Sequence, residues 1–100
     1  MARIIWTEPA LQELDEIADY ISLDDPAAAK KLVRKAFERV DHLVRHPKSG
    51  KRIEEFEASV YREIILPPCR IFYRVADNIV YIIHVIREEQ LLHIDILKSR

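Results

Sequence analysis

Four side chains in the second half of the sequence have types that suit acid–base and phosphate chemistry. His84 and His93 are candidates for proton transfer, because imidazole titrates near neutral pH. Arg70 and Arg87 are cations that could stabilise negative charge developing on a phosphate. The alternation around His84 places it on a strand face expected to be buried, where a structural histidine is favoured, and the conformation around His93 is left open. The four residues are a candidate catalytic set, and none is assigned as catalytic.

The charged residues are unevenly distributed along the chain, although the formal net charge is only −1. Residues 1–25 hold one basic and seven acidic side chains, whereas residues 26–52 hold nine basic and two acidic ones. The basic segment is either an anion-binding surface or the charge complement of an acidic neighbouring helix. The sequence leaves both interpretations open.

Length and composition indicate one small globular domain. One hundred residues can bury a two-layer core, and we expect a single domain over residues 1–100. No apolar run approaches the roughly 20 residues that span a bilayer, and no apolar signal core follows the N-terminus, so we expect no membrane association and a cytoplasmic protein. Cys69 is the only cysteine, which excludes an internal disulfide and a thiolate metal cluster. We expect neither a metal nor another cofactor.

The N-terminal half indicates a strand and two amphipathic helices. Arg3–Trp6 is a short β-branched and aromatic run typical of a strand. Thr7 then suits an N-cap, and apolar residues recur at helical spacing from Glu8 to about Ser22 beside an acidic outer face. A second apolar stripe predicts a helix from about Pro26 to Arg45. Residues 51–59 are expected to be irregular.

From Val60 onward the hydrophobic period changes to two, which predicts strands over residues 60–66, 69–75 and 79–86. Asp77 and Asn78 suit a tight turn between the last two strands. The face expected to pack on the helices carries Ile71, Tyr73, Val75, Val80, Ile82, His84 and Ile86. The opposite face, expected to be open, carries Arg70, Phe72, Arg74, Tyr81, Ile83 and Val85. The segment from residue 88 to 97 fits either a short helix or an extended tail.

These elements predict an α+β fold. In it an N-terminal strand and a helical hairpin pack on an antiparallel sheet, in the order β-α-α-β-β-β, and a C-terminal tail or short helix follows. Gly50, the only glycine, lies in the loop that leads from the second helix to the sheet, where the backbone has the most freedom.

Several short blocks resemble one family when their order and spacing are taken together. They are Trp6-Thr-Glu-Pro-Ala-Leu with Leu14, Ile17, Ala18, Tyr20 and Ile21, then Pro26-Ala-Ala-Ala, His46-Pro-Lys-Ser-Gly-Lys, Tyr61-Arg-Glu-Ile and Arg70-Ile-Phe-Tyr-Arg-Val. From Ile5 to about Val85 the chain resembles the ParE/RelE superfamily of toxins from bacterial type II toxin–antitoxin systems. The resemblance implies a growth-inhibiting toxin, a role in plasmid or chromosome stabilisation, and a hetero-oligomeric complex with an antitoxin.

The superfamily has two main activities, and the residues favour one of them. RelE-like members cut messenger RNA on the ribosome, whereas ParE-like members act on DNA gyrase and block replication. An enzyme that works within ribosomal RNA is expected to be strongly basic, and this chain is not. Arg70 aligns with a charge-stabilising arginine of RelE-like enzymes but is present in ParE-like members too. Where RelE-like enzymes carry a C-terminal Arg and Tyr, this chain has Glu88 and Ile94.

We therefore favour a toxin that inhibits DNA gyrase by binding it and that a ParD-like antitoxin neutralises. The first alternative is a RelE-like ribosome-dependent mRNA endoribonuclease that uses Arg70, His84, Arg87 and His93. The second is a non-toxic module that only binds an antitoxin. Many ParE-like relatives carry a His-Gly-x-Arg turn after the last strand, whereas Arg87-Glu-Glu-Gln follows here, which leaves potency open.

Two surfaces follow from this interpretation. The target-binding surface is expected on the open sheet face and its neighbours, at Arg62, Arg70, Phe72, Arg74 and Arg87. The alternatives are that Phe72 packs under the tail and that Arg74 pairs with an acidic neighbour. The antitoxin is expected to place a helix in an apolar groove of the helical hairpin, at Leu11, Leu14, Ile17, Phe37 and Val40. An added strand on an exposed sheet edge is a second mode of antitoxin binding.

Overall fold

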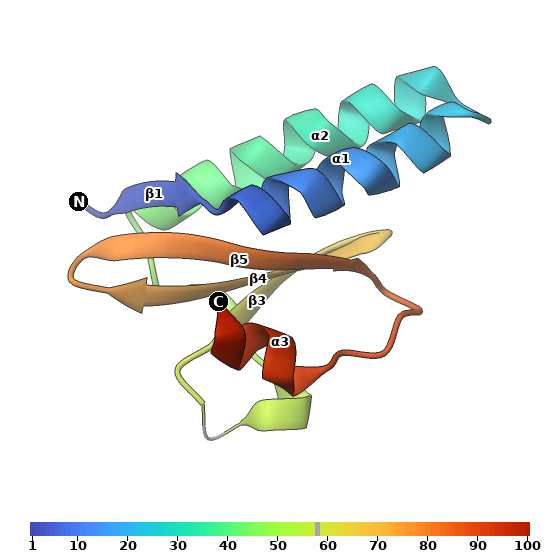
Figure 1. The fold of residues 1–100 in the computed structure, drawn as a ribbon. Helices are drawn as coiled ribbons and strands as arrows, with labels where there is room; N and C mark the ends of the chain where they lie inside the picture. The colour runs from blue at the N-terminus through green and yellow to red at the C-terminus, as the bar shows by residue number, and fades with distance from the viewer. Residues whose placement is uncertain (58) are drawn as a thin grey trace.

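The computed structural model describes residues 1–57 and 59–100. In this part of the chain the strands are β1 (Arg3–Trp6), β2 (Lys51–Arg52), β3 (Arg62–Leu66), β4 (Cys69–Ala76) and β5 (Ile79–Arg87). The α-helices are α1 (Glu8–Ser22), α2 (Pro26–Asp41) and α3 (Ile94–Ser99), with 3-10 turns η1 (His42–Val44) and η2 (Glu54–Phe56). Figure 1 shows the α1–α2 hairpin on one face of the sheet and α3 on the other. This arrangement confirms the α+β fold class.

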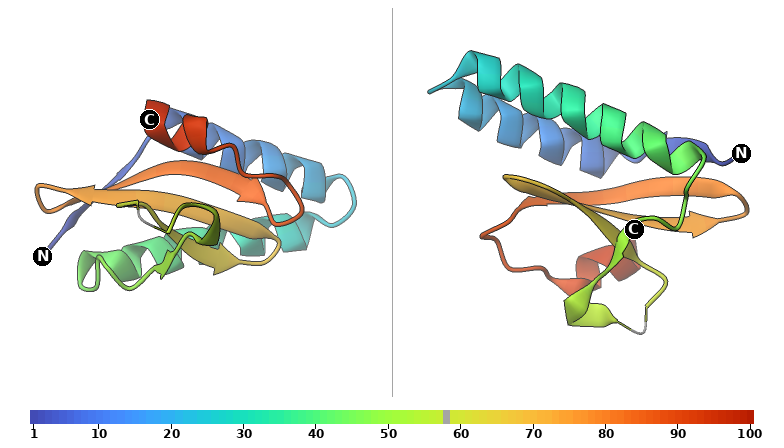
Figure 2. Two further views of the ribbon diagram at one scale, coloured as in Figure 1. Left: turned by 90° about the horizontal axis from the view of Figure 1, so that it is seen from below. Right: turned by 180° about the vertical axis from the view of Figure 1, so that it is seen from behind.

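The five strands form one sheet in the order β1-β5-β4-β3-β2. The strands from β2 to β5 pair antiparallel, but β1 pairs parallel with β5, so the sheet is mixed rather than purely antiparallel. The two other views in Figure 2 show the hairpin and the C-terminal segment on opposite sides of this sheet. Its two edges are therefore β1 and the short β2 beside β3.

Different contacts fix the starts of the two long helices. Thr7 occupies the predicted N-cap position of α1, but its amide and hydroxyl both donate to the carbonyl of Ile82 in β5, at 3.0 and 2.7 Å, rather than to the first turn of the helix. Asp25 caps α2 by accepting from the amide of Ala28 at 3.1 Å. Asp77 and Asn78 have φ values of 52° and 61°, as a type I′ hairpin turn requires, which confirms the predicted turn.

Several predicted boundaries were wrong. The regular helix α2 ends at Asp41 rather than Arg45, because the chain tightens into the 3-10 turn η1 before the loop. The segment expected to be irregular contains β2 and η2, whereas Ala58 within it lies outside the described residues. The C-terminal segment ends in the short helix α3, which was one of the two alternatives.

A β-bulge overturns part of the face assignment. Phe72 of β4 pairs with His84 of β5 and Tyr73 pairs with Ile82, so Ile83 is an extra residue on β5. Beyond this bulge the alternation shifts by one, and Val85 joins the core under the helices whereas Ile86 joins the opposite core. The predicted sides of these two residues were wrong, because strict alternation assumes a ladder without a bulge. His84 also lies on the opposite face from the one predicted, because it pairs with Phe72 and stacks on its ring at 5.7 Å.

The sheet face expected to be open is also covered. Phe72 and Ile83 are both 0% exposed, and with Ile86 of β5 they form a second apolar core that is covered by Ile53 of the 51–57 segment and by Leu92 and Leu97 of the C-terminal tail. Apolar side chains alternate onto both faces of β4 and β5, so each face needs a covering layer. The prediction of an open face was wrong. Among the described residues no helix is long and apolar enough to cross a membrane.

Candidate functional site

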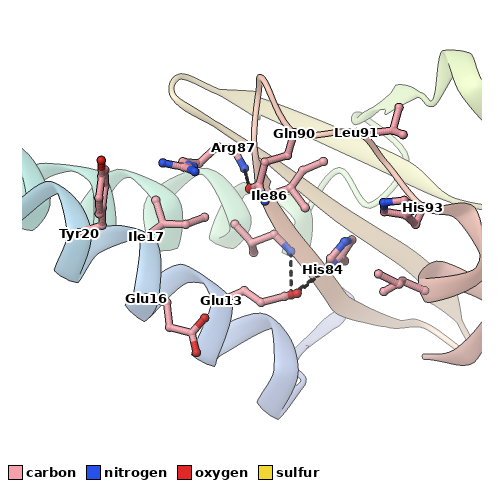
Figure 3. A pocket seen from close by; sticks show the side chains of 12 residues that line it. Glu13, Glu16, Ile17, Tyr20, His84, Ile86, Arg87, Gln90, Leu91 and His93 are labelled. Atoms are coloured by element: carbon pink, nitrogen blue, oxygen red, sulfur yellow. Dashed lines mark hydrogen bonds and ion pairs between the residues drawn. The ribbon is translucent and has the colours of Figure 1, made fainter.

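A cavity lies where α1, the end of β5 and the segment before α3 meet (Figure 3). We call this cavity of about 690 Å³ the tail pocket; its lining is Glu13, Glu16, Ile17, Tyr20, His84, Val85, Ile86, Arg87, Gln90, Leu91, His93 and Ile96. It therefore collects three of the four candidate catalytic residues. Arg70 is not part of it.

A partly buried polar cluster forms the inner wall of the tail pocket. A carboxylate oxygen of Glu13 lies 2.9 Å from Nδ1 of His84 and accepts from the amide of Val85 at 3.1 Å. The guanidinium of Arg100 donates to the same oxygen of Glu13 at 2.8 Å and to the carbonyl of Ile83 at 3.0 Å. The cluster thus ties α1, β5 and the C-terminal residue together.

The electrostatics of this cluster favour a structural role. Burial raises the pKa of the Glu13 carboxyl, but hydrogen bonds from His84, Arg100 and the amide of Val85 outweigh burial and lower that pKa below its usual range. A carboxylate with a lowered pKa is a weak general base at neutral pH. His84 is only 3% exposed, and its Nδ1 is engaged. The predicted burial of His84 is confirmed.

The outer rim of the tail pocket has the character of a protein contact surface. Tyr20 and Leu91 are 65% and 74% exposed. The guanidinium of Arg87 lies 5.3 Å from the centre of the Tyr20 ring and 3.1 Å from the carboxylate of Glu89. Exposed His93 precedes α3 at the same rim. Tyrosine and arginine are the residue types most enriched among binding hot spots.

Arg70 lies in a separate cluster on the other side of the sheet from α1 and α2. Its guanidinium binds both oxygens of Glu63, at 2.8 and 3.0 Å, and both oxygens of Glu55, at 2.9 and 3.0 Å. Glu63 is 2% exposed. The hydrogen bonds raise the pKa of Arg70, with Glu63 the larger contributor, and the hydrogen bond from Arg70 lowers the pKa of Glu55. The charge of Arg70 is therefore more than balanced by two carboxylates.

The other predicted target-binding residues are scattered. Phe72 is fully buried and offers no contact surface in this structure. The alternative prediction, that Phe72 packs under the tail, is the one observed. Arg62 donates to the carbonyl of Gly50 at 2.9 Å. Arg74 is partly buried and stacks over the ring of Tyr81 at 4.3 Å, rather than pairing with a carboxylate.

The predicted apolar groove on the helical hairpin exists in a smaller form. We call it the hairpin groove; it has a volume of about 410 Å³ and is lined by Leu11, Gln12, Leu14, Asp15, Val33 and Phe37. Leu11 and Phe37 are 39% and 38% exposed, and Leu14 lies almost buried at the floor. Ile17 lines the tail pocket instead, and Val40 is fully buried in the core, so neither lines the groove.

Several contributing residues were not assigned to a site from the sequence, among them Tyr20 and Leu91 on the rim of the tail pocket. Glu13 shares a helix face with Ala10 and Ile17, and an acidic residue on an apolar stripe is a signal that could have identified it. Val33 was part of the apolar stripe of α2 but was not assigned to a groove. Nothing in the sequence pattern marks the contact of Arg100, because it depends on where the tail folds.

The two interpretations of the basic segment can now be compared. Within the described residues no salt bridge joins α1 to α2. All nine basic side chains of residues 26–52 are exposed. Direct charge complementarity between the two helices is therefore absent from these contacts, and the basic residues of α2 face solvent.

The chain is similar in sequence to a family of bacterial toxins and to two individual toxins. Residues 4–92 match the family described as the ParE toxin of type II toxin-antitoxin system, parDE. The chain is 33% identical over 85 residues to "Toxin RelE2" of Caulobacter vibrioides, covering 85% of this chain and 93% of that protein. It is 40% identical over 79 residues to "Putative toxin Y4kP" of Sinorhizobium fredii, covering 77% and 79%.

Two solved structures share the fold. A chain from the chromosomal ParDE toxin–antitoxin system of P. aeruginosa superposes with a TM-score of 0.74 at 28% identity, over 89% of this chain and 98% of that one. A chain of the toxin–antitoxin complex RelBE2 from Mycobacterium tuberculosis gives a TM-score of 0.58 at 22% identity, over 87% and 98%. The second likeness bears on the fold alone.

Proposed function

The chain belongs to the ParE toxin family of type II toxin–antitoxin systems, and on that premise we propose that it inhibits DNA gyrase by binding it, without covalent chemistry of its own. A ParD-like antitoxin would hold it inactive. The rim of the tail pocket, with Tyr20, Arg87 and Leu91, is the contact surface that we assign to the target.

The main support for this proposal is that Arg70 is ion-paired with two carboxylates. RNA cleavage needs a cation near the phosphate that develops charge, together with an acid and a base within hydrogen-bonding reach. Arg70 is bound by Glu55 and Glu63, and the two carboxylates leave no net positive charge for a phosphate. Arg70 does not line the tail pocket, where His84 and His93 lie, although Arg70 and His84 both lie against the ring of Phe72, at 4.9 and 5.7 Å from its centre. A candidate ribonuclease site would have to free Arg70 from its two carboxylates or use another cation.

Two further observations support binding rather than catalysis. His84 is buried, and its Nδ1 is held by Glu13, so proton exchange with a bulky RNA substrate is hindered at that nitrogen. The net charge of −1 is unfavourable for work within ribosomal RNA, where phosphate contacts dominate affinity.

The alternative is a ribosome-dependent endoribonuclease. Its support is the name of the Caulobacter relative, "Toxin RelE2", and the gathering of His84, Arg87 and His93 around one cavity. Under this alternative the histidines would do the chemistry with Arg87 as the cation. Replacing His93 with Ala would then abolish mRNA cleavage.

Antitoxin binding is proposed at the hairpin groove. Leu11 and Phe37 are the exposed apolar residues of the groove, and Val33 extends it on α2. A groove of this shape suits one apolar face of an amphipathic helix. Leu14 contributes only the floor, and Val40 no longer belongs to the proposed surface.

The deciding experiment uses the purified chain, freed of antitoxin and refolded, in two assays run side by side. Lost supercoiling by gyrase with accumulation of cleaved DNA, while in vitro translation continues, is the expected result. Leu91→Asp should weaken this inhibition, and Val60→Asp is the matched control because Val60 is 73% exposed away from the tail pocket. Blocked translation with cut mRNA would instead establish the ribonuclease, and no effect on either assay would indicate a non-toxic binding module.

A further inference from the structure

One flank of α2 carries a row of positive charges. Lys31, Lys35 and Arg39 recur every four residues, which places them on one side of the helix at intervals of about 6 Å along its axis. All three are exposed, and none has an ion-pair partner among residues 1–57 and 59–100. We call these three residues the basic row.

The acidic residues nearest in the sequence do not neutralise the basic row. Glu38 contacts Arg34 instead, at 3.9 Å. Asp41 has neither the i, i+3 nor the i, i+4 spacing to any residue of the row, so it faces a different side of the helix. On the neighbouring strand β3, the carboxylate of Glu63 is engaged by Arg70. The row is therefore free to meet negative charges of a partner.

The basic row begins beside the rim of the tail pocket. Lys31 lines a hollow of about 600 Å³ together with Ile21 and Pro68. Ile21 directly follows Tyr20 of the rim. The carbonyl of Pro68 accepts from the amide of Glu88, just beyond β5, at 2.8 Å. A partner that covers the rim can therefore continue along the row on one connected surface.

A further cation lies at the other end of the basic row. Arg39 lines a second hollow, of about 250 Å³, together with Lys51 of β2. Lys51 lies 3.6 Å from the carboxylate of Glu54, but both side chains are largely exposed, so this pair is weak. The positive surface thus extends from the rim of the tail pocket along α2 to β2.

We propose that the basic row binds the phosphate backbone of duplex DNA, namely the DNA held by gyrase, while the rim of the tail pocket contacts the gyrase protein. This inference rests on the proposed function, because gyrase presents a protein surface and duplex DNA together. Duplex DNA carries about one negative charge per 1.7 Å of its axis. The row spans about 12 Å from Lys31 to Arg39, so phosphates are available along its whole length.

The composition of the basic row favours DNA over an acidic protein surface. Two of its three residues are lysines, which bind phosphate as point charges and need no fixed geometry. Protein interfaces are depleted in lysine and are anchored by aromatic residues. The exposed aromatic residue of α2, Phe37, lines the hairpin groove on the other flank of the helix.

The net charge of −1 is compatible with this contact. Seven acidic side chains are concentrated in residues 1–25, which include α1, and the hairpin groove by which α1 meets α2 lies on the flank away from the row. A toxin within ribosomal RNA meets phosphates on several sides, whereas a duplex on the row touches one flank. Three or four phosphate contacts give only weak binding to free DNA at physiological salt, so gyrase must supply the rest of the affinity.

The first test measures binding of the refolded, antitoxin-free chain to a labelled 20-base-pair DNA duplex by fluorescence anisotropy. Three contacts predict a slope of about −2.7 or steeper for log affinity against log salt, which is a loss of about fortyfold or more between 50 and 200 mM. Lys35→Gln should make the slope shallower by about 0.9, and Lys31→Gln with Lys35→Gln by about 1.8.

The matched control is Lys98→Gln, which removes the same charge from an exposed lysine of α3, on the other face of the sheet (Figure 1). It should leave the slope unchanged. Equal changes for Lys35→Gln and Lys98→Gln would overturn the proposal. Tighter binding to an RNA duplex of the same sequence than to DNA would also overturn it, in favour of a ribosomal partner.

The second test places a photoreactive residue at position 35, 91 or 98 and irradiates the chain with gyrase and labelled DNA. Position 35 should cross-link to DNA, position 91 to gyrase protein, and position 98 to neither. Lys31→Glu with Lys35→Glu should also raise the concentration for half-inhibition of supercoiling about tenfold or more, because the reversed charges repel phosphates. Cross-linking of position 35 to protein alone, or unchanged inhibition by the folded double variant, would overturn the proposal.

Failure of this inference is distinguishable from failure of the proposed function. A chain that inhibits gyrase and cross-links to it through position 91, with full potency in the double variant, would remove the DNA contact alone. A chain without effect on gyrase that still binds the duplex through Lys31 and Lys35 would keep the phosphate site and remove gyrase as the target and as the source of the DNA.

Discussion

The amide of Gly50 donates to the hydroxyl of Tyr73 at 2.8 Å, and a Cβ atom added to residue 50 would lie 2.4 Å from that same oxygen. Tyr73 is fully buried, and burial raises its pKa. The only glycine of the chain is thus required for close approach of the loop to the core. The same loop leads to β2 and so determines how far the edge of β3 is covered.

Gly50→Ala is expected to destabilise the protein by about 1–3 kcal/mol, because the ring of Tyr73 must shift within a packed core. Chemical denaturation measures the free energy of unfolding. Ser49→Ala, at an exposed neighbour, should change it by less than about 0.5 kcal/mol. If Gly50→Ala were as stable as Ser49→Ala, the close approach would not exist in solution.

The Glu13 cluster should make stability depend on pH. The pKa of Glu13 in the folded chain lies below its unfolded value, so its contribution is present above that unfolded value, near the ordinary 4.5, and is lost as pH falls through the lowered folded pKa. Glu13→Gln should therefore cost about 1–3 kcal/mol at pH 7, where three donors lose a charged acceptor. The difference between the two proteins should shrink toward pH 3.

Glu16→Gln is the control for this titration, because Glu16 is exposed on the same helix and makes no ion pair within the described residues. Denaturation curves at several pH values compare the three proteins. A constant difference between wild type and Glu13→Gln down to pH 3 would contradict the assigned ionisation.

Replacing Arg70 should lower the stability of the folded protein. Arg70→Ala leaves the buried carboxylate of Glu63 without its cation, which is expected to cost about 3–5 kcal/mol. Arg70→Met with Glu63→Met removes both charges and should recover most of that loss. If the double variant folds and still inhibits its target, Arg70 is structural. A folded double variant without inhibition would return Arg70 to the target-binding surface predicted from the sequence.

Much of the fold was predictable because its signals are local. The helix start at Asp25 and the turn at Asp77 depend on residues within a few positions of each other, and both are observed. Thr7 also occupies its predicted N-cap position, but its hydroxyl bonds to the distant carbonyl of Ile82. The bulge at Ile83 was not predictable from alternation, because it depends on how β4 and β5 align over their whole length. One extra residue was enough to exchange the sides of Val85 and Ile86.

The candidate site was predictable only in part for the same reason. Residue types identified His84, Arg87 and His93, and the fold does gather them around the tail pocket. The neutralisation of Arg70 depends on Glu55, whose segment was expected to be irregular. Burial of Phe72 depends on the tail, which the sequence left between two conformations. No local sequence pattern shows which distant segment will cover a sheet face.

The hairpin groove gives the last prediction. Phe37→Asp places a charge at the most accessible aromatic position of the groove, beside Trp6, whose ring centre is 4.9 Å from that of Phe37. If an antitoxin helix docks there, its affinity should fall by at least about 2 kcal/mol, which is roughly thirtyfold. Isothermal titration of purified antitoxin measures this directly. Val60→Asp, at an exposed apolar residue away from the groove, should leave the affinity unchanged. A folded Phe37→Asp variant that binds as tightly as wild type would move antitoxin recognition off the hairpin groove.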